Sequence, residues 1–213
     1  MEIKIDQIGK RFLHGWVFRN LNYTFRNSTV YGIAGRNGSG KSTFLKIISG
    51  LLTASEGKII YEDFDQLIRR EDIYRQVNIA APYSELIEEY TLEELIQFHS
   101  QFKSSSLIKS THDWIELMEL RHAASRPVNQ FSSGMKQRVK LGLAMYSDGK
   151  ILILDEPTSN LDEKAKAWFL YHHEKTTTGK VVLIASNESE DFKLAREVIR
   201  LDSVNHGVPA LQV

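Results

Sequence analysis

The segment 35–43 has the residue types and spacing of a loop that binds a polyphosphate: Gly35 is followed five positions later by the triplet Gly40-Lys41-Ser42. Glycines allow backbone N–H groups to approach an anion closely, and the N-terminus of a following helix favours negative charge. In this pattern the lysine reaches the β- and γ-phosphates, and the serine hydroxyl binds Mg²⁺. The sequence therefore predicts that ATP or GTP is bound by Gly35, Arg36, Asn37, Gly38, Ser39, Gly40, Lys41, Ser42 and Thr43.

Two adjacent carboxylates, Asp155 and Glu156, end the apolar run 151–154. A strand of apolar residues alone is typical of the buried centre of a parallel sheet, and such sheets carry their chemistry at the strand C-termini. We expect Asp155 to help hold Mg²⁺. Glu156 is expected to lie beside the γ-phosphate, where it orients or activates an attacking water.

A third polar group, Ser132-Ser133-Gly134, precedes a run rich in apolar residues. Ser132 or Ser133 is predicted to cap the helix that follows, and the exposed N-terminus of that helix can bind an anion. A capped amphipathic helix is common, so this segment gains its weight from its position, about twenty residues before the Asp155-Glu156 pair.

The elements that position these groups follow from the apolar pattern. Residues 1–30 alternate like antiparallel strands, and within them Phe12 or Trp16 could stack on an adenine ring or pack on the sheet. Residues 55–61 are predicted to form a turn and a strand, 67–75 a short charged helix, and 77–81 a buried strand that Pro82 ends.

A change in pattern begins at Thr91, where Thr91-Leu92-Glu93-Glu94 has the form of a capping box. Apolar residues then recur at helical spacing, first in 92–102 and again in 114–120. The segment 83–140 is therefore expected to be helical and inserted between strands, with its apolar stripes in the core. The residues 180–186 and 197–203 are predicted to be further strands.

Composition excludes several classes of protein. Lys plus Arg and Asp plus Glu both number 27 in the 213 residues, so net charge gives no support for a protein that coats nucleic acid. The absence of cysteine excludes disulfides and thiol chemistry and is compatible with the cytosol. No run approaches the ~20 apolar residues of a membrane span, so we expect a membrane role only through a partner.

Four motifs in one order resemble the ATP-binding cassette (ABC) family over nearly the whole chain. Residues 35–43 match its Walker A motif, 131–135 are similar to its L-S-G-G-Q signature, 151–156 match Walker B, and 159–162 resemble the D-loop. The resemblance implies an α/β P-loop NTPase with an N-terminal antiparallel β region, a parallel-sheet core and an inserted helical subdomain. It implies one ABC ATPase domain over 1–213, with a nucleotide-binding core at 1–82 and 141–213 and a helical subdomain at 83–140.

The family resemblance also implies a function and partners. Two protomers, identical or related, pair head to tail with two Mg-ATP molecules between them, and Ser132, Ser133 and Gly134 of one protomer reach the nucleotide held by the other. ATP closes the dimer and hydrolysis opens it, which drives a separate transmembrane subunit docked on the helical segment. The expected location is the cytoplasm, peripheral at the inner face of the cell membrane through that partner.

Two positions depart from the family pattern. The family usually has a glutamine where the sheet meets the helical lobe, and here that position is Pro82, with Tyr83, Ser84 and Glu85 as candidate replacements. The family's switch histidine is replaced by Asn187, which can donate a neutral hydrogen bond but carries no charge, and charge-assisted bonds are roughly twice as strong. The candidate catalytic residues are Glu156, Lys41 and Asn187. We expect ATP binding and dimer closure to persist, and hydrolysis either to be slow or to depend on Glu156 and unconventional partners.

Three alternatives stay open at this point. A regulatory module could bind ATP without turning it over, which the missing glutamine and histidine allow. A soluble ABC-type protein could act on ribosomes or DNA, although such proteins commonly carry two cassettes or long insertions. A P-loop kinase would leave the signature-like segment unexplained.

Overall fold

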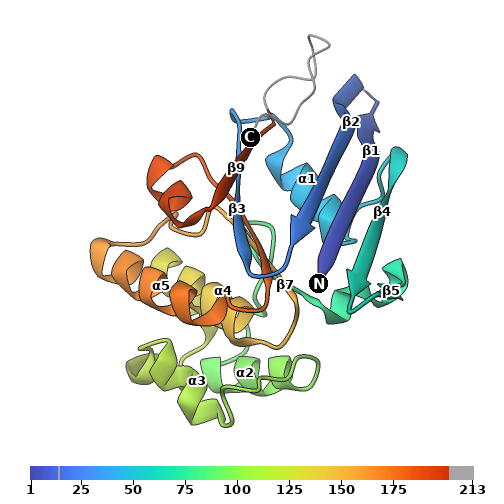
Figure 1. Ribbon diagram of the computed structural model, residues 1–213. Coiled ribbons are helices and arrows are strands. Elements are labelled where there is room, and N and C mark those ends of the chain that lie inside the picture. Colours follow the sequence, from blue (N-terminus) through green and yellow to red (C-terminus); the bar gives the residue numbers. More distant parts are fainter. Residues whose placement is uncertain (14, 202–213) are drawn as a thin grey trace.

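The alternating residues at the start of the chain form an antiparallel sheet with strand order β2-β1-β4-β5 (Figure 1). Ile3, Ile5 and Ile8 point into the core, and charged neighbours lie between them. This confirms the predicted antiparallel region. The strands are β1 (Glu2–Phe12), β2 (Gly15–Arg26), β4 (Glu56–Asp63) and β5 (Gln66–Ile68). The computed structural model describes residues 1–13 and 15–201.

The apolar runs form a parallel sheet with strand order β6-β7-β8-β3-β9. All five residues of β7 are buried because β6 and β8 flank it and both sheet faces are covered. The strands are β3 (Thr29–Ala34), β6 (Val77–Ala80), β7 (Ile151–Asp155), β8 (Val181–Ala185) and β9 (Glu197–Arg200). The last prediction, 197–203, extended to Asp202 and Ser203, which lie outside the described residues.

Helix α1 (Lys41–Ile48) lies between the two sheets (Figure 1). Phe44, Leu45 and Ile48 are buried in a core shared with the inner faces of both sheets. The chain enters α1 through Gly40 at φ 98° and leaves it through Gly50 at φ 81°, both values that favour glycine. The glycine loop is thus held directly between a buried strand and a buried helix.

The other helices form a second core with the opposite face of the parallel sheet, and α4 packs against α5 and β6 within it. The predicted capping box is present, since the Glu94 carboxylate accepts from the Thr91 N–H at 2.8 Å and Thr91 Oγ1 accepts from the Glu94 N–H at 3.3 Å. The helices are α2 (Leu92–Ser100), α3 (Thr111–Leu117), α4 (Ser133–Tyr146) and α5 (Glu163–Thr176). No helix in the described residues is long and apolar enough to cross a membrane.

The predicted helix over 67–75 is wrong in its first part. Leu67 pairs with Glu62 in the β4–β5 hairpin, whose turn places Phe64 and Asp65 at positive φ. Residues 66–68, part of which was predicted to be helical, therefore form the edge strand β5 of the antiparallel sheet. Only Arg70–Arg75 is helical, as a 3₁₀ turn, and further 3₁₀ turns occupy Arg121–Ala123, Val128–Gln130 and Ser189–Leu194.

Candidate functional site

Most of the predicted site residues follow the C-terminal ends of neighbouring strands. The glycine loop follows β3, Glu156 follows β7, and Asn187 comes two residues after β8. Since parallel strands end at one edge of the sheet, three segments far apart in sequence meet there. Side-chain hydrogen bonds join the three segments to one another.

Lys41 is buried at the first position of α1, and its ammonium group is bonded within the loop. Nζ donates to the carbonyl of Gly35 at 2.8 Å, to the carbonyl of Arg36 at 3.4 Å, and to Oδ1 of Asn187 at 2.8 Å. The three donors of the ammonium group thus reach three acceptors. These bonds hold the backbone of the glycine loop around the ammonium group and connect the loop to Asn187 after β8.

Asn187 is exposed, and its carboxamide connects three segments. Besides accepting from Lys41, it donates through Nδ2 to Oδ1 of Asn37 at 2.7 Å and to Oε1 of Glu156 at 2.7 Å. One amide therefore lies between the predicted phosphate-binding cation and the predicted base. The structure brings Lys41, Asn187 and Glu156 together.

Glu156 occupies a turn at φ 51°, an uncommon value for a residue with a side chain. Its N–H donates to the carbonyl of Ala185 at 2.7 Å, which fixes the turn to the end of β8. Burial raises the pKa of the Glu156 carboxyl, and the backbone N–H of Asn187 opposes that rise. A carboxylate with a raised pKa is better suited to accept a proton from water.

Asp155 is almost fully buried, and its Oδ2 has no hydrogen-bond partner among the residues that the structure describes. Burial raises the pKa of this carboxyl, whereas a hydrogen bond from Ser42 and the positive charge of Lys41 lower it. The Ser39 hydroxyl oxygen is also buried without a partner. Unpartnered buried oxygens are costly, so these groups indicate a site that is completed by a ligand.

The three residues that the sequence offered in place of the family's glutamine have different surroundings. Ser84 bonds back to both backbone groups of Ala81, with its hydroxyl donating to the carbonyl at 2.7 Å, and Glu85 is exposed. Tyr83 packs its ring under the Lys46 ammonium at 4.0 Å, and its hydroxyl is buried with no hydrogen-bond partner in residues 1–13 and 15–201. Burial and, to a smaller extent, the negative charge of Asp155 raise the pKa of the Tyr83 phenol, so it remains a proton donor.

The signature-like residues lie apart from this group. Ser132 caps α4 by accepting from the N–H of Met135 at 3.3 Å, which decides between the two predicted caps. Ser132, Ser133 and Gly134 line a cavity of about 330 Å³ together with Asn160 and with Ala165 of α5. Within the described residues, no hydrogen bond joins them to the glycine loop of the same chain.

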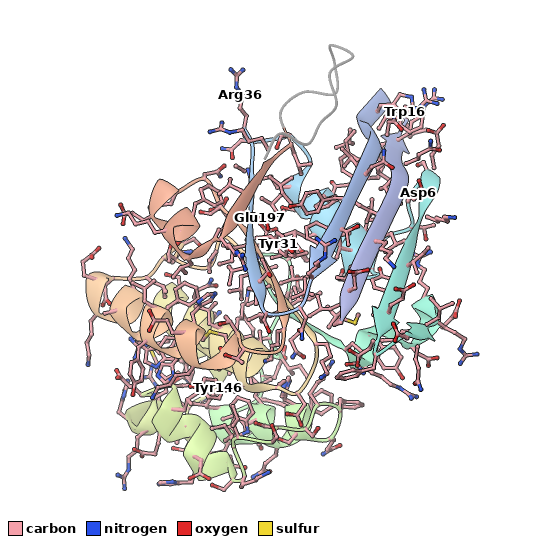
Figure 2. All side chains as sticks on the ribbon, in the orientation of Figure 1. Asp6, Trp16, Tyr31, Arg36, Tyr146 and Glu197 are labelled. Atoms are coloured by element: carbon pink, nitrogen blue, oxygen red, sulfur yellow. The ribbon has the colours of Figure 1, made fainter. Side chains whose placement is uncertain are left out.

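The aromatic candidates lie at the tip of the β1–β2 hairpin. Phe12 is about half exposed under the ammonium of Lys10, and Trp16 stacks on the guanidinium of Arg19 with 4.5 Å between group and ring centre. Figure 2 shows Trp16 and Arg36 at the same end of the molecule, with Arg36 extending outward from the loop after β3. Val17 and Phe18 come close to the loop, because a Cβ on Gly40 would lie 2.5 Å from the Val17 side chain.

Sequence reasoning missed Gln137. This side chain is 7% exposed, and its Nε2 donates to the carbonyl of Pro157 at 2.9 Å and to that of Glu156 at 3.4 Å. It joins α4 to the turn that carries the predicted base. A glutamine five residues after the Ser132 cap gives no sign in the sequence that it is buried, because an exposed glutamine on the same helix would look the same.

The chain matches a family model described as ABC transporter over residues 18–159. It is 31% identical over 208 residues to an uncharacterized ABC transporter ATP-binding protein of Bacillus subtilis, covering 96% of this chain and 93% of the relative. It is 32% identical to a probable sulfate/thiosulfate import ATP-binding protein of Chlorella vulgaris, covering 95% and 88% of the two chains.

Solved structures share the fold. A bacterial ABC transporter cassette solved as a dimer superposes with a TM-score of 0.79 at 24% identity, covering 94% of each chain. The same cassette, solved as a dimer in a post-hydrolysis state bound to ADP and phosphate, gives a TM-score of 0.78 at 23% identity, covering 93% of each chain. The expected α/β architecture with antiparallel and parallel sheets is thereby confirmed.

Proposed function

The chain belongs to the ABC transporter family, and we propose that it is an ATP-binding subunit that hydrolyses Mg-ATP to drive a separate transmembrane subunit. The observation that carries this proposal is the hydrogen-bonded group Lys41–Asn187–Glu156 at the edge of the parallel sheet. This group supports the proposal because a phosphate-binding cation, a neutral donor and a base of raised pKa would then lie within reach of one bound triphosphate.

The groups beside this cluster suit Mg²⁺. The metal prefers oxygen ligands and is usually held by one or two carboxylates together with substrate phosphates, so a large acidic cluster is not required. The buried, unpartnered Oδ2 of Asp155 and the neighbouring Ser42 hydroxyl supply such oxygens. When bound, Mg²⁺ would neutralise charge on the β- and γ-phosphates.

Hydrolysis needs a water to attack the γ-phosphorus while the bond to the β-phosphate oxygen breaks and ADP leaves. Glu156 accepts the proton of that water. Lys41 exchanges its loop carbonyls for phosphate oxygens, and the other loop residues, 35–40 and 42–43, contribute backbone N–H groups or hydroxyls. Asn187 holds Lys41 and Glu156 in position, and the Tyr83 hydroxyl supplies the donor that Pro82 lacks.

The remaining nucleotide contacts come from a second protomer. Ser132, Ser133 and Gly134 lie at the N-terminus of α4 beside a cavity, and in the described hydrogen bonds they do not contact the glycine loop of their own chain. In a head-to-tail dimer, identical or with a related subunit, this N-terminus covers the partner's ATP and adds donors to its γ-phosphate. A similar cassette has been solved as a dimer, which supports this arrangement.

The assembly extends to the membrane. The helical segment 83–140 forms the docking surface within one ABC ATPase domain over 1–213, whose core is 1–82 and 141–213. The subunit is then peripheral on the cytoplasmic face, and no nucleic acid takes part. Phe12 would stack on the adenine from the hairpin tip.

A second candidate is a regulatory module that binds ATP and hydrolyses it slowly or not at all. The neutral Asn187 and the proline at position 82 favour it, because both positions lack the group usual in the family. The two candidates share a site and differ in turnover.

Two measurements on the purified chain test the proposal. Sedimentation with Mg-ATP should show a dimer for Glu156→Gln, which traps the bound nucleotide, and a monomer for Lys41→Ala. Steady-state phosphate release should be measurable in the wild type and lower by about a hundredfold or more in Glu156→Gln. Equal rates in those two proteins would contradict hydrolysis by Glu156, and failure of either to bind ATP would contradict the site itself.

A further inference from the structure

Gln137 is a buried carboxamide on α4 whose role is not explained by helix packing. Its side chain is 7% exposed, and its nitrogen donates to two successive backbone carbonyls, those of Glu156 at 3.4 Å and Pro157 at 2.9 Å. A buried amide is costly unless it is hydrogen-bonded, so these two acceptors fix where the side chain can lie.

The acceptors belong to the turn that aims the Glu156 side chain. Glu156 is in the left-handed region at φ 51°, a conformation that persists only when its surroundings hold it. The holding contacts are the N–H of Glu156 to the Ala185 carbonyl at 2.7 Å, the Ser159 hydroxyl to the Glu156 carbonyl at 2.8 Å, and the Gln137 amide. The first fixes the turn to β8, and the last fixes it to α4.

A second contact ties the same two segments together. A Cβ on Gly134 would lie 3.0 Å from the Asn160 carbonyl oxygen, so the first turn of α4 packs against backbone just past the Glu156 turn. Residues 134 and 137 thus contact residues 156–160 at two points. The start of α4 and this turn are held as one unit.

We propose that Gln137 is a positioning residue for hydrolysis, which holds the Glu156 turn so that the carboxylate meets the attacking water. The inference rests on the proposed function, because it assigns Glu156 its role as base. Gln137 touches no residue of the glycine loop in the described hydrogen bonds, so it acts on the chemical step and leaves ATP affinity unchanged. A displacement of about 1 Å at a reacting group can lower a rate roughly a hundredfold.

The chain offers a matched control in Asn78. This carboxamide is 5% exposed, and it also donates to two successive carbonyls, those of Ser147 at 2.9 Å and Asp148 at 3.3 Å. It holds the other end of α4, away from Glu156. Asn78→Leu and Gln137→Leu therefore remove the same kind of bond from equally buried places.

The experiment compares both leucine variants in the wild type and in Glu156→Gln, measuring ATP affinity, melting temperature and single-turnover ATP hydrolysis. We expect similar losses of melting temperature in the two variants. Only Gln137→Leu should lower the rate, by roughly tenfold or more, with ATP affinity within about twofold of wild type. In Glu156→Gln, Gln137→Leu should cause no further loss.

Three results would overturn the inference. They are equal rates for Asn78→Leu and Gln137→Leu, a parallel loss of ATP affinity, or a further loss of rate in Glu156→Gln. If Gln137→Leu does not fold, Gln137→Glu, which keeps the shape and replaces the donor by an acceptor, takes its place with the same expectations. A wild type without hydrolysis dependent on Glu156 would overturn the proposed function and this inference together, whereas a Glu156-dependent rate unaffected at position 137 overturns the inference alone.

Discussion

The segments that follow β6 and β8 differ in how far the protein satisfies its own polar groups. After β8, Asn187 is exposed, yet its carboxamide bonds to Lys41, Asn37 and Glu156. After β6, the Tyr83 hydroxyl is buried and has no hydrogen-bond partner in the described part of the chain. Each segment contains a position where the sequence predicted a departure from the family pattern. Among the described residues, side-chain hydrogen bonds join the segment after β8 to the glycine loop and to Glu156, and none does so for Tyr83.

The difference separates two kinds of contribution. Removing Asn187 breaks existing bonds, two of them to the charged groups of Lys41 and Glu156, so it should affect the ligand-free protein and catalysis alike. Removing the Tyr83 hydroxyl breaks no bond in the ligand-free protein. Its effect should appear only when the site is filled.

The largest effect should come from Glu156. Its side chain accepts from Asn187 after β8, and the proposed roles of Asn187 and Tyr83 both serve the reaction in which Glu156 is the base. Glu156→Gln keeps the shape and the contact with the Asn187 amide but removes the base, so steady-state phosphate release should fall by about a hundredfold or more. ATP affinity should stay near the wild-type value in equilibrium binding. A smaller fall would mean that a group at the β6 end acts as the base.

Asn187→Ala should lower phosphate release by roughly tenfold and also weaken ATP binding, because it frees both Lys41 and Glu156. Glu188→Ala, which truncates the exposed neighbouring side chain, is the control and should behave as wild type in both assays. If Asn187→Ala keeps the wild-type rate, the hydrogen bonds after β8 have no part in turnover.

Tyr83→Phe should lower phosphate release by about three- to tenfold, the value of one hydrogen bond. Thermal unfolding without ligand should be unchanged or shifted upward, because the variant loses a buried hydroxyl that has no partner. Ser84→Ala provides the reverse case: it loses the bonds to Ala81 and should cost about 1 kcal/mol of stability without affecting the rate. A Tyr83→Phe protein that is destabilised but fully active would contradict the claim that the Tyr83 hydroxyl acts only when the site is filled.

The smallest effect should be a shift in the pH profile. Burial raises the pKa of Glu156, and donors to its carboxylate stabilise the ionised, active form. Activity should therefore fall as pH falls through this raised pKa, and Asn187→Ala should move that acid limb to higher pH. Tyr83→Phe should leave the limb in place, since no hydrogen bond joins Tyr83 to Glu156 in the described residues. An equal shift of the acid limb in Asn187→Ala and Tyr83→Phe would show that the two residues do not differ in their effect on the Glu156 carboxylate.

The fold was largely predictable because its signals are local. The apolar run of β7, the Thr91 capping box and the glycines beside α1 each specify a conformation from neighbouring residues. The exception is 67–75, where pairing of Leu67 with Glu62 overrode local preference. That pairing depends on a turn in which Phe64 and Asp65 have positive φ. The sequence of this turn contains no glycine that would have predicted such a conformation.

The sequence proposed candidate site residues but could not give the connections between them. The glycine-loop spacing indicated Lys41, the end of the apolar run indicated Glu156, and the family resemblance indicated Asn187, but no sequence rule gives the bonds between them. Tyr83, Ser84 and Glu85 were equivalent on paper, and only the path of the backbone after β6 buries the Tyr83 hydroxyl and folds Ser84 back on Ala81. Gln137 was missed for the same reason, since its burial depends on a turn 19 residues away.

The bonds from Lys41 to the carbonyls of Gly35 and Arg36 have a consequence for the kinetics of nucleotide capture. They preorganise the glycine loop, so its conformational entropy is lost during folding and not during association. An incoming triphosphate then only exchanges acceptors around an ammonium group that is already in place. Association should therefore be fast and limited by encounter, and differences in affinity among loop variants should appear mainly as differences in dissociation rate.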